Sequence, residues 1–220
     1  TFVKKAADVN ADTEINVADL TGVATIILYG SFNPTSNAKG FAAVEPSVLS
    51  VRNQMVKAGT EFTIDVNING KYAFSGYQFD MNLPEGISVK TIDNRNTDFF
   101  ASGITGENTM RVLSASTKGE CFEGTESCVA RITLIADENI ETGDYAIDMN
   151  NIIISSNGNS QTLNDTKFVV HVGETTGITN INAEGEFAIY DMTGKMVKKA
   201  TSLDGLKKGV YVVNGHKVIK

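Results

Sequence analysis

Short runs of alternating apolar and polar residues fill the chain from residue 41 to residue 173, and such alternation is typical of β-strands with one wet face. In the run TEFTIDVNING the apolar face consists of Phe62, Ile64, Val66 and Ile68. In YQFDMNLP it consists of Tyr77, Phe79, Met81 and Leu83. Further candidate strands, separated by Gly, Asn and Asp clusters, lie in segments 43–51, 86–92, 109–116, 128–136, 145–155 and 167–172. About eight short strands predict an antiparallel β-sandwich of the jelly-roll or Greek-key type.

The pattern near the amino terminus is helical instead. Apolar residues recur at steps of three and four, which predicts an amphipathic helix with these residues on one face: Val17, Leu20, Val23 or Ala24, and Ile27. The helix should end at Gly30, because the following SFNPTSNAKG is rich in residues that favour turns.

The last segment predicts four more strands, around Phe187–Tyr190, Met196–Lys199, Val210–Val213 and Lys217–Ile219. A piece this small buries little core alone, so it should dock on something or be completed by another strand. We therefore expect a mainly β protein with a loop and helix at 1–30, a linker at 31–40, a sandwich at 41–173 and a small β-module at 174–220.

Composition narrows the possible partners. The net charge of −7 and the pI near 4.9 disfavour nucleic acid and anionic membranes, because both require a basic face. No apolar run reaches the roughly 18 residues of a membrane span, so none is expected. Proteins or neutral glycans are the expected partners.

Oxygen-bearing side chains recur in DVNADTEINVAD at loop positions one, three, five, nine and twelve: Asp8, Asn10, Asp12, Asn16 and Asp19. A hard cation such as Ca²⁺ takes about six to eight oxygen ligands, and a twelve-residue loop that enters a helix can supply them. Position seven, Glu14, would contribute its backbone carbonyl. The alternative is an Asx-rich turn that caps the helix, but capping explains one of these residues rather than five. We predict a Ca²⁺ site.

Loop, helix and the segment ATIILYG together resemble one repeat of a type I dockerin, whose usual form is DxNxDGxxNxxD before a helix. Ala11 and Thr13 stand where such loops usually carry glycine, which lowers the expected affinity. The resemblance implies that Val17 and Ala18 contact a protein partner. Dockerins have two repeats, and FVKKAADVN is similar to the join before a second one, so a first repeat upstream of Thr1 is a hypothesis.

The central region resembles a cohesin or a related carbohydrate-binding sandwich. The segments that carry the resemblance are VLSVRNQMVKAGTEFTIDVNI and FSGYQFDMNLPEGISV. It implies non-catalytic, calcium-dependent protein assembly or adhesion with a cohesin- or dockerin-type partner. The alternative is a carbohydrate-binding module of a surface polysaccharide-utilisation system, and a plain structural spacer is also possible on this pattern. For glycan binding we would inspect Tyr72, Tyr77, Phe99 and Phe100 as an exposed aromatic patch.

A dockerin-like helix beside a cohesin-like sandwich can join copies head to tail or fold back on its own sandwich. We expect the fold-back, because an isolated helix exposes an apolar face that needs covering.

The carboxyl-terminal segments FAIYDMTGKMVKKA and LDGLKKGVYVVNGHKVIK resemble the sorting domain of type IX secretion cargo. The resemblance implies a secreted or cell-surface location in a Gram-negative bacterium.

Two further features bear on chemistry. Cys121 and Cys128 lie close enough in sequence to close a small disulfide loop, or they remain reduced thiols. His171 and His216 fall in different modules, without a GxSxG or HExxH motif. We therefore expect no catalytic residues and no enzyme activity.

Overall fold

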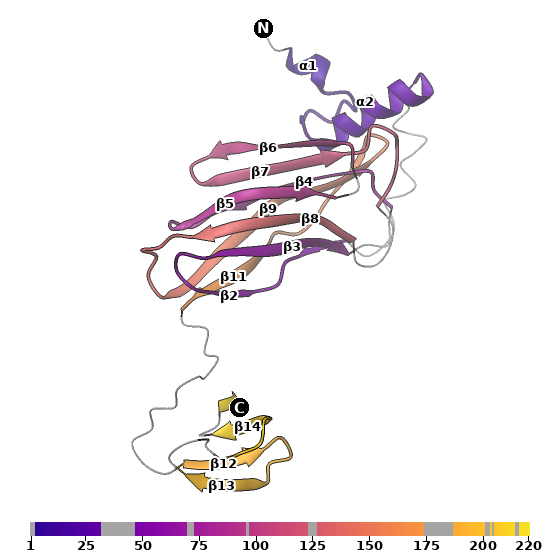
Figure 1. The fold of residues 1–220 in the computed structure, drawn as a ribbon. Helices are drawn as coiled ribbons and strands as arrows, with labels where there is room; N and C mark the ends of the chain where they lie inside the picture. Colours follow the sequence, from indigo (N-terminus) through magenta and orange to yellow (C-terminus); the bar gives the residue numbers. More distant parts are fainter. Residues whose placement is uncertain are drawn as a thin grey trace. The chain divides into compact units, whose positions relative to one another are not determined.

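The computed structural model describes residues 3–31, 47–69, 73–95, 97–122, 127–173, 187–200, 203, 205–213 and 216–220. The chain forms two compact units, Thr1–Gly173 and Glu174–Lys220 (Figure 1). The first contains a two-layered sandwich and two helices, α1 at Lys4–Ala7 and α2 at Val17–Tyr29. No helix among the described residues has the length and hydropathy that a membrane span requires.

Two sheets make the sandwich. The four-stranded sheet has the order β1 (Val48–Ser50), β3 (Glu61–Asn69), β8 (Ser127–Ala136) and β5 (Ile87–Asn94). The seven-stranded sheet has the order β2 (Gln54–Val56), β11 (Thr166–Val172), β9 (Gly143–Ser156), β4 (Gly76–Asn82), β7 (Thr109–Ala115) and β6 (Phe99–Gly106), with β10 (Asn159–Thr162) beside β9. All neighbours run antiparallel except β2 and β11. The predicted antiparallel β-sandwich is confirmed.

The core lies where the two sheets face each other, and the alternating runs supply it. Ile64, Val66 and Ile68 point inward from β3 and are fully buried. Tyr77, Phe79 and Met81 meet them from β4. Burying each such side chain contributes about 1.5–3 kcal/mol. Because the side-chain period of a strand is two, this core also fixes the register, with Ile64 opposite Ile132.

The sequence pattern did not predict every strand. β2, β6 and β10 are additional to the predicted set. β2 has three residues and β10 has four, which is too short for a visible alternation. β6 carries no alternation, because almost all of its side chains are exposed on both faces.

The outer face of β4 is also buried, and it carries an ion pair. Arg111 Nε and Nη2 donate to Asp80 Oδ1 and Oδ2 at 2.6 and 2.7 Å, and Asn151 Nδ2 donates to Oδ2 at 3.2 Å. Burial alone would raise the pKa of Asp80, but the hydrogen bonds from Arg111 and Asn151 outweigh it and lower the pKa below its ordinary value. The pair ties β4 to β7 and β9.

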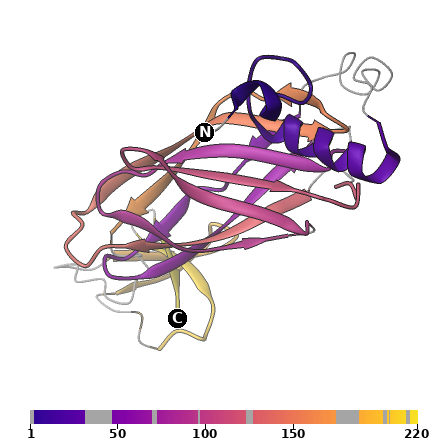
Figure 2. The same cartoon turned by 90° about the horizontal axis from the view of Figure 1, so that it is seen from above.

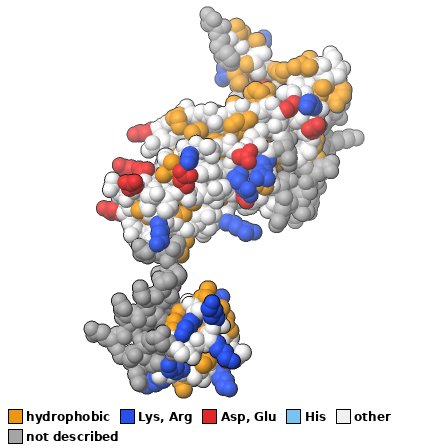
Figure 3. Space-filling model, viewed as in Figure 1, with side chains coloured by type: hydrophobic (Ala, Val, Ile, Leu, Met, Phe, Trp, Pro, Cys, Tyr) orange, Lys and Arg blue, Asp and Glu red, His pale blue; other side chains and the backbone are white. Residues whose placement is uncertain are grey.

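The second unit is one antiparallel sheet with the order β13 (Met196–Ala200), β12 (Phe187–Asp191), β14 (Val210–Val213) and β15 (His216–Ile219). These strands confirm the four that the sequence predicts. Ile189, Val213 and Val218 form its small core. Lysines outnumber acidic residues in this unit, with Lys195, Lys198, Lys199, Lys207, Lys208, Lys217 and Lys220 against Glu174, Glu184, Glu186, Asp191 and Asp204. Figure 3 shows lysine side chains spread over the visible face of this unit.

We predict that Asp80→Asn lowers the free energy of unfolding by about 2 kcal/mol at pH 7, because a partly buried guanidinium loses its charged partner. The folded-state pKa of Asp80 lies below its unfolded value, so the stabilisation is present above about pH 4 and is lost as the pH falls further. Urea unfolding at pH 7 and at about pH 3 measures this difference. Asp148→Asn, on an exposed position of β9, is the matched control. Equal effects of both variants at pH 7 would contradict the prediction.

Candidate functional site

The N-terminal loop from Asp8 to Asp19 folds around its own side-chain oxygens. Asp8 Oδ1 accepts from the backbone N of Asp12 and Asp8 Oδ2 from that of Thr13, both at 3.1 Å. Asn10 Oδ1 also accepts from Asp12 N at 3.2 Å, and Asp12 Oδ1 accepts from Glu14 N at 2.9 Å. The backbone is thus wrapped around the side chains of loop positions one, three and five.

This wrapping places two non-glycine residues in the left-handed region. Ala11 has φ 59° and Thr13 has φ 76°. The left-handed conformation costs an L-residue about 1–2 kcal/mol, and a β-branched residue such as threonine is a marked outlier there. The two positions where dockerin-like loops usually carry glycine are therefore strained in this chain.

Asp19 closes the loop onto the helix. Its side chain accepts from Val9 N at 2.7 Å and from Asn16 N at 2.9 Å, and the residue is only 5% exposed. Asn16 Oδ1 in turn accepts from Ala18 N at 2.7 Å, which completes a capping box at the start of α2. The positive end of the helix dipole compensates the buried carboxylate. Asp19 therefore combines the capping role with the twelfth loop position.

The predicted ligands are only partly gathered. Asn10 Nδ2 donates to Asp12 Oδ2 at 2.7 Å, so these two side chains touch and both lie beside Asp8. Asn16 Nδ2 approaches Glu14 Oε2 at 3.5 Å. Within the described residues, no three Asp, Glu, His or Cys side chains are arranged to hold a metal ion. A cation here would need the amide and backbone oxygens too, and Ca²⁺ binding remains a prediction.

Helix α2 docks on the sandwich through hydroxyl groups. Thr21 Oγ1 lies 2.6 Å from Ser155 Oγ and accepts from Gly158 N at 3.0 Å. Thr25 Oγ1 donates to Asn157 Oδ1 at 3.3 Å. The strands that α2 contacts are β9, β4, β10 and β7. Figure 2 shows the helix lying across one end of the sandwich. The expected fold-back of the helix on its own sandwich is thus what the structure shows.

Two glycines allow the helix to approach this closely. A Cβ at Gly76 of β4 would lie 2.8 Å from Thr21 Cγ2 and 2.9 Å from Val17 Cγ2. A Cβ at Gly22 of α2 would lie 3.3 Å from Val9 Cγ1 and 3.6 Å from Gly158 Cα. Gly76 has no room for a side chain while α2 stays in place, and we call this contact the α2 seat: Val17 and Thr21 against Gly76, Ser155 and Gly158.

The buried face of the helix differs from the predicted one. Small and hydroxyl residues face the sandwich: Val17, Ala18, Thr21, Gly22, Ala24 and Thr25. Ile27, predicted on the apolar face, is 74% exposed, and Val23 is 38% exposed. Val17 and Ala24, which were predicted on the same face, are buried as expected. The close approach at Gly76 selects for small side chains, which explains why Val23 and Ile27 are left exposed. Val17 and Ala18, predicted to contact a partner, are fully buried within this chain, and Val17 lies against Gly76 of the sandwich.

The sequence matches no protein-family profile and no curated protein, but the fold has relatives among solved structures. A non-cellulosomal cohesin from Archaeoglobus fulgidus aligns over 60% of this chain and 94% of its own, at 12% identity and a TM-score of 0.50. The sixth cohesin of Acetivibrio cellulolyticus scaffoldin B aligns over 59% and 100%, at 13% identity and a TM-score of 0.52. A cohesin module from a Clostridium perfringens family 33 glycoside hydrolase aligns over 60% and 98%, at 20% identity and a TM-score of 0.51.

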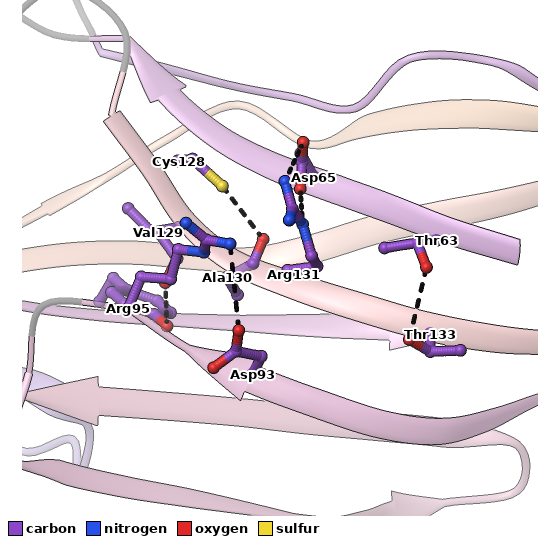
Figure 4. A network of polar contacts seen from close by, with 10 residues as sticks. Thr63, Asp65, Asp93, Arg95, Cys128, Val129, Ala130, Arg131 and Thr133 are labelled. Atoms are coloured by element: carbon purple, nitrogen blue, oxygen red, sulfur yellow. Dashed lines mark hydrogen bonds and ion pairs between the residues drawn. The ribbon is translucent and has the colours of Figure 1, made fainter.

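The sandwich has a cohesin-like fold. On it, the outer face of the four-stranded sheet is polar (Figure 4). Arg131 Nε and Nη2 donate to Asp65 Oδ1 and Oδ2 at 2.7 and 3.1 Å, and these hydrogen bonds lower the pKa of Asp65. Lys90 pairs with Glu61 on the same sheet. The bidentate pair joins β3 and β8, the two inner strands of this sheet, and is half-exposed.

The cysteines of the cohesin-like sandwich are both thiols in this structure. Cys128 Sγ contacts Ala130 O at 3.6 Å, and Cys121 Sγ contacts Gly119 O at 3.7 Å. Burial raises the pKa of the Cys128 thiol, with a further contribution from the nearby Asp65 carboxylate. A higher pKa reduces the thiolate fraction and hence the reactivity of Cys128. The disulfide between the two residues remains a prediction.

The aromatic candidates do not form one patch. Tyr77 is fully buried in the cohesin-like core, where its hydroxyl donates to Val129 O at 2.9 Å. Phe100 packs against the same core, and Phe99 is 38% exposed on β6. Tyr72 lies outside the described residues.

The two histidines show no catalytic partner in the described residues. His171 Nδ1 lies 2.6 Å from Asp144 Oδ1 at an exposed position where β11 pairs with β9, and the side chain of His216 is outside the described set.

We predict that Gly76→Val displaces α2 from the cohesin-like sandwich, because the added side chain overlaps Val17 and Thr21. The expected result is faster proteolysis within residues 3–31, with the sheets intact by circular dichroism. Gly143→Val is the control, because the nearest atom to a Cβ there is 3.9 Å away. Resistance of residues 3–31 equal to that of the unmodified chain would show that the seat does not hold the helix.

Proposed function

We propose that this chain is a secreted, non-catalytic assembly module. Its cohesin-like sandwich binds a protein partner through the outer face of the four-stranded sheet, and its N-terminal loop holds Ca²⁺. The observation that carries the proposal is the placement of α2. The helix contacts β9, β4, β10 and β7, all in or beside the seven-stranded sheet, and leaves the opposite face to other partners.

The four-stranded face has the chemistry of a protein-binding surface. Its strands present Asp65, Arg131, Glu61 and Lys90 as exposed ion pairs. Pairs of this kind add little to folding stability, so they can be exchanged for contacts with a partner at small cost. Arginine is enriched at the energetic centres of interfaces, and Arg131 lies on β8, an inner strand of this sheet. The Acetivibrio cellulolyticus cohesin was solved in complex with a dockerin, which makes a dockerin-type partner the first to test.

The loop supplies the oxygens that calcium would need. Asp8, Asn10, Asp12 and Asp19 would hold the ion through side chains, with the Glu14 carbonyl and Asn16 completing the set. A bound divalent ion would neutralise the carboxylates of the loop. Asn10 Nδ2 also donates to Gly158 O at 3.2 Å, so ordering of the loop would reinforce the α2 seat.

The proposed secreted location rests on the C-terminal unit, Glu174–Lys220. We propose that the C-terminal unit acts as a sorting domain and delivers the chain to the outside of the cell. Its four strands and small core make a self-contained sheet that fits this role.

Calcium binding is tested by calorimetric titration of the full chain. We expect one site with a dissociation constant on the order of 10⁻⁴ M, as in extracellular calcium modules. Asp12→Ala should abolish the signal, and Thr13→Gly should tighten binding several-fold, because glycine relieves the left-handed strain. Asp148→Ala removes an equal charge elsewhere and is the control. Binding that survives Asp12→Ala would remove the loop from the proposal.

Partner binding is tested with purified type I dockerins as titrants, in calcium and in a chelator. We expect Arg131→Ala to weaken binding at least tenfold, since tenfold corresponds to about 1.4 kcal/mol and central arginines often contribute more. Lys167→Ala, on β11 of the other sheet, should leave binding unchanged. Absence of binding to every dockerin would overturn the dockerin-type partner. Equal losses in the two variants would overturn the assigned face.

A further inference from the structure

Strand β6 is an unprotected sheet edge. Among the described strands it is the outermost of the seven-stranded sheet, with β7 as its one neighbour (Figure 1). Seven of its eight residues are exposed, and Phe100 is the one that packs on the core. On its outer side, a strand with one neighbour presents a row of backbone N–H and C=O groups to solvent.

The composition of β6 makes this edge unusual. Its sequence FFASGITG contains no charged residue and no proline. Ile104 is 66% exposed and Phe99 is 38% exposed. Its pairing with β7 is regular from Phe99 to Ile104, and the register shifts only beyond Ile104. Sheets usually protect such edges with lysine, proline, bulges or short strands, and β6 uses none of these over that stretch.

Every other edge strand among the described residues has at least one such device. β1 and β2 have three residues each and β10 has four. β5 carries Lys90 and a register shift after Val89. In the second unit, β13 carries two lysines and a register shift in its pairing, and β15 has four residues including Lys217. The contrast identifies β6 as the edge that is open to another strand.

We propose that β6 is a dimerisation edge, which pairs antiparallel with β6 of a second copy of this chain. A partner that extends the sheet at β6 must itself be a strand with an unpaired edge. Among the described strands, only β6 offers such an edge over six regular residues, so the strand that matches β6 is β6 itself. Identical strands in antiparallel pairing form a closed two-fold contact. No charge on either strand opposes the approach.

Side-chain alternation sets the register of the pair. A two-fold axis perpendicular to the sheet must place residues of the same face opposite each other. Centred on Ser102, it sets Phe100 of each copy opposite Ile104 of the other and Ala101 opposite Gly103. Aromatic and β-branched residues make favourable cross-strand pairs. The exposed Ile104 would thereby gain a partner, and the two seven-stranded sheets would become continuous.

The association should be weak and should respond to salt in a diagnostic direction. Pairing of one short strand buries less than the roughly 1,200 Å² of typical stable interfaces. Each copy carries a net charge of −7, so the copies repel at low salt. Raising the salt to about 0.5 M screens this repulsion and should strengthen the dimer. Association between the lysine-rich second unit and acidic surfaces would instead weaken with salt.

Sedimentation velocity of the full chain across a concentration series tests the proposal. We expect a monomer–dimer equilibrium that tightens with salt and does not depend on calcium or on a dockerin. Ser102→Lys sets two like charges against each other at the centre of the pair and should weaken the dimer at least tenfold. Ser88→Lys places the same charge on the edge strand β5 and should leave the dimer unchanged.

A disulfide cross-link tests the same contact and does not depend on whether β6 folds normally with the lysine of Ser102→Lys. In a background carrying Cys121→Ser and Cys128→Ser, Ser102→Cys should form a disulfide-linked dimer under mild oxidation, and Ser88→Cys should not. A monomer at all concentrations and salts, species larger than a dimer, or equal behaviour of the two positions would overturn the proposal.

Discussion

Strand β4 is the constraint on which the larger unit depends, because both of its faces are buried. Its inward side chains Tyr77, Phe79 and Met81 fill the space between the sheets. Its outward positions serve two other purposes, since Gly76 receives helix α2 and Asp80 holds Arg111. Core packing, the ion pair and the helix seat therefore share one seven-residue strand. A shift of β4 by one residue would exchange its two faces and break all three at once.

The strands that build the core were predictable because alternation records which face is wet. The run that became β3 is an example, with Ile64, Val66 and Ile68 all buried. β6 was not predicted, because a strand that is exposed on both faces has no apolar face and therefore shows no alternation. The buried face of α2 was predicted only in part, because Val17 and Ala24 are buried as expected but Val23 and Ile27 are exposed. Helical periodicity located the large apolar residues, but the sandwich selected Thr21 and Thr25, whose hydroxyl groups reach polar partners on β9 and the turn after it.

The candidate site was predictable in its residues and not in its arrangement. Spacing alone identified the oxygen-bearing positions, and the structure folds the backbone around Asp8, Asn10 and Asp12. The double role of Asp19, as twelfth loop residue and capping side chain, required coordinates because it depends on contacts with Val9 and Asn16. The role of Gly76 lay beyond sequence analysis altogether. Its partner residues are more than fifty positions away, and a glycine in a strand carries no sign of what approaches it.

The α2 seat and the contact between the two sheets are built from different kinds of side chain. The helix is attached by hydroxyl hydrogen bonds and small side chains, whereas the sheets are joined by large buried apolar residues. No residue of the helix belongs to the large apolar core cluster, so we expect loop and helix to open together at a lower free energy than global unfolding. Amide hydrogens of this unit should exchange with solvent while those of β3, β4 and β8 stay protected. Such opening of the amino-terminal segment would uncover one end of the seven-stranded sheet while both sheets stay folded.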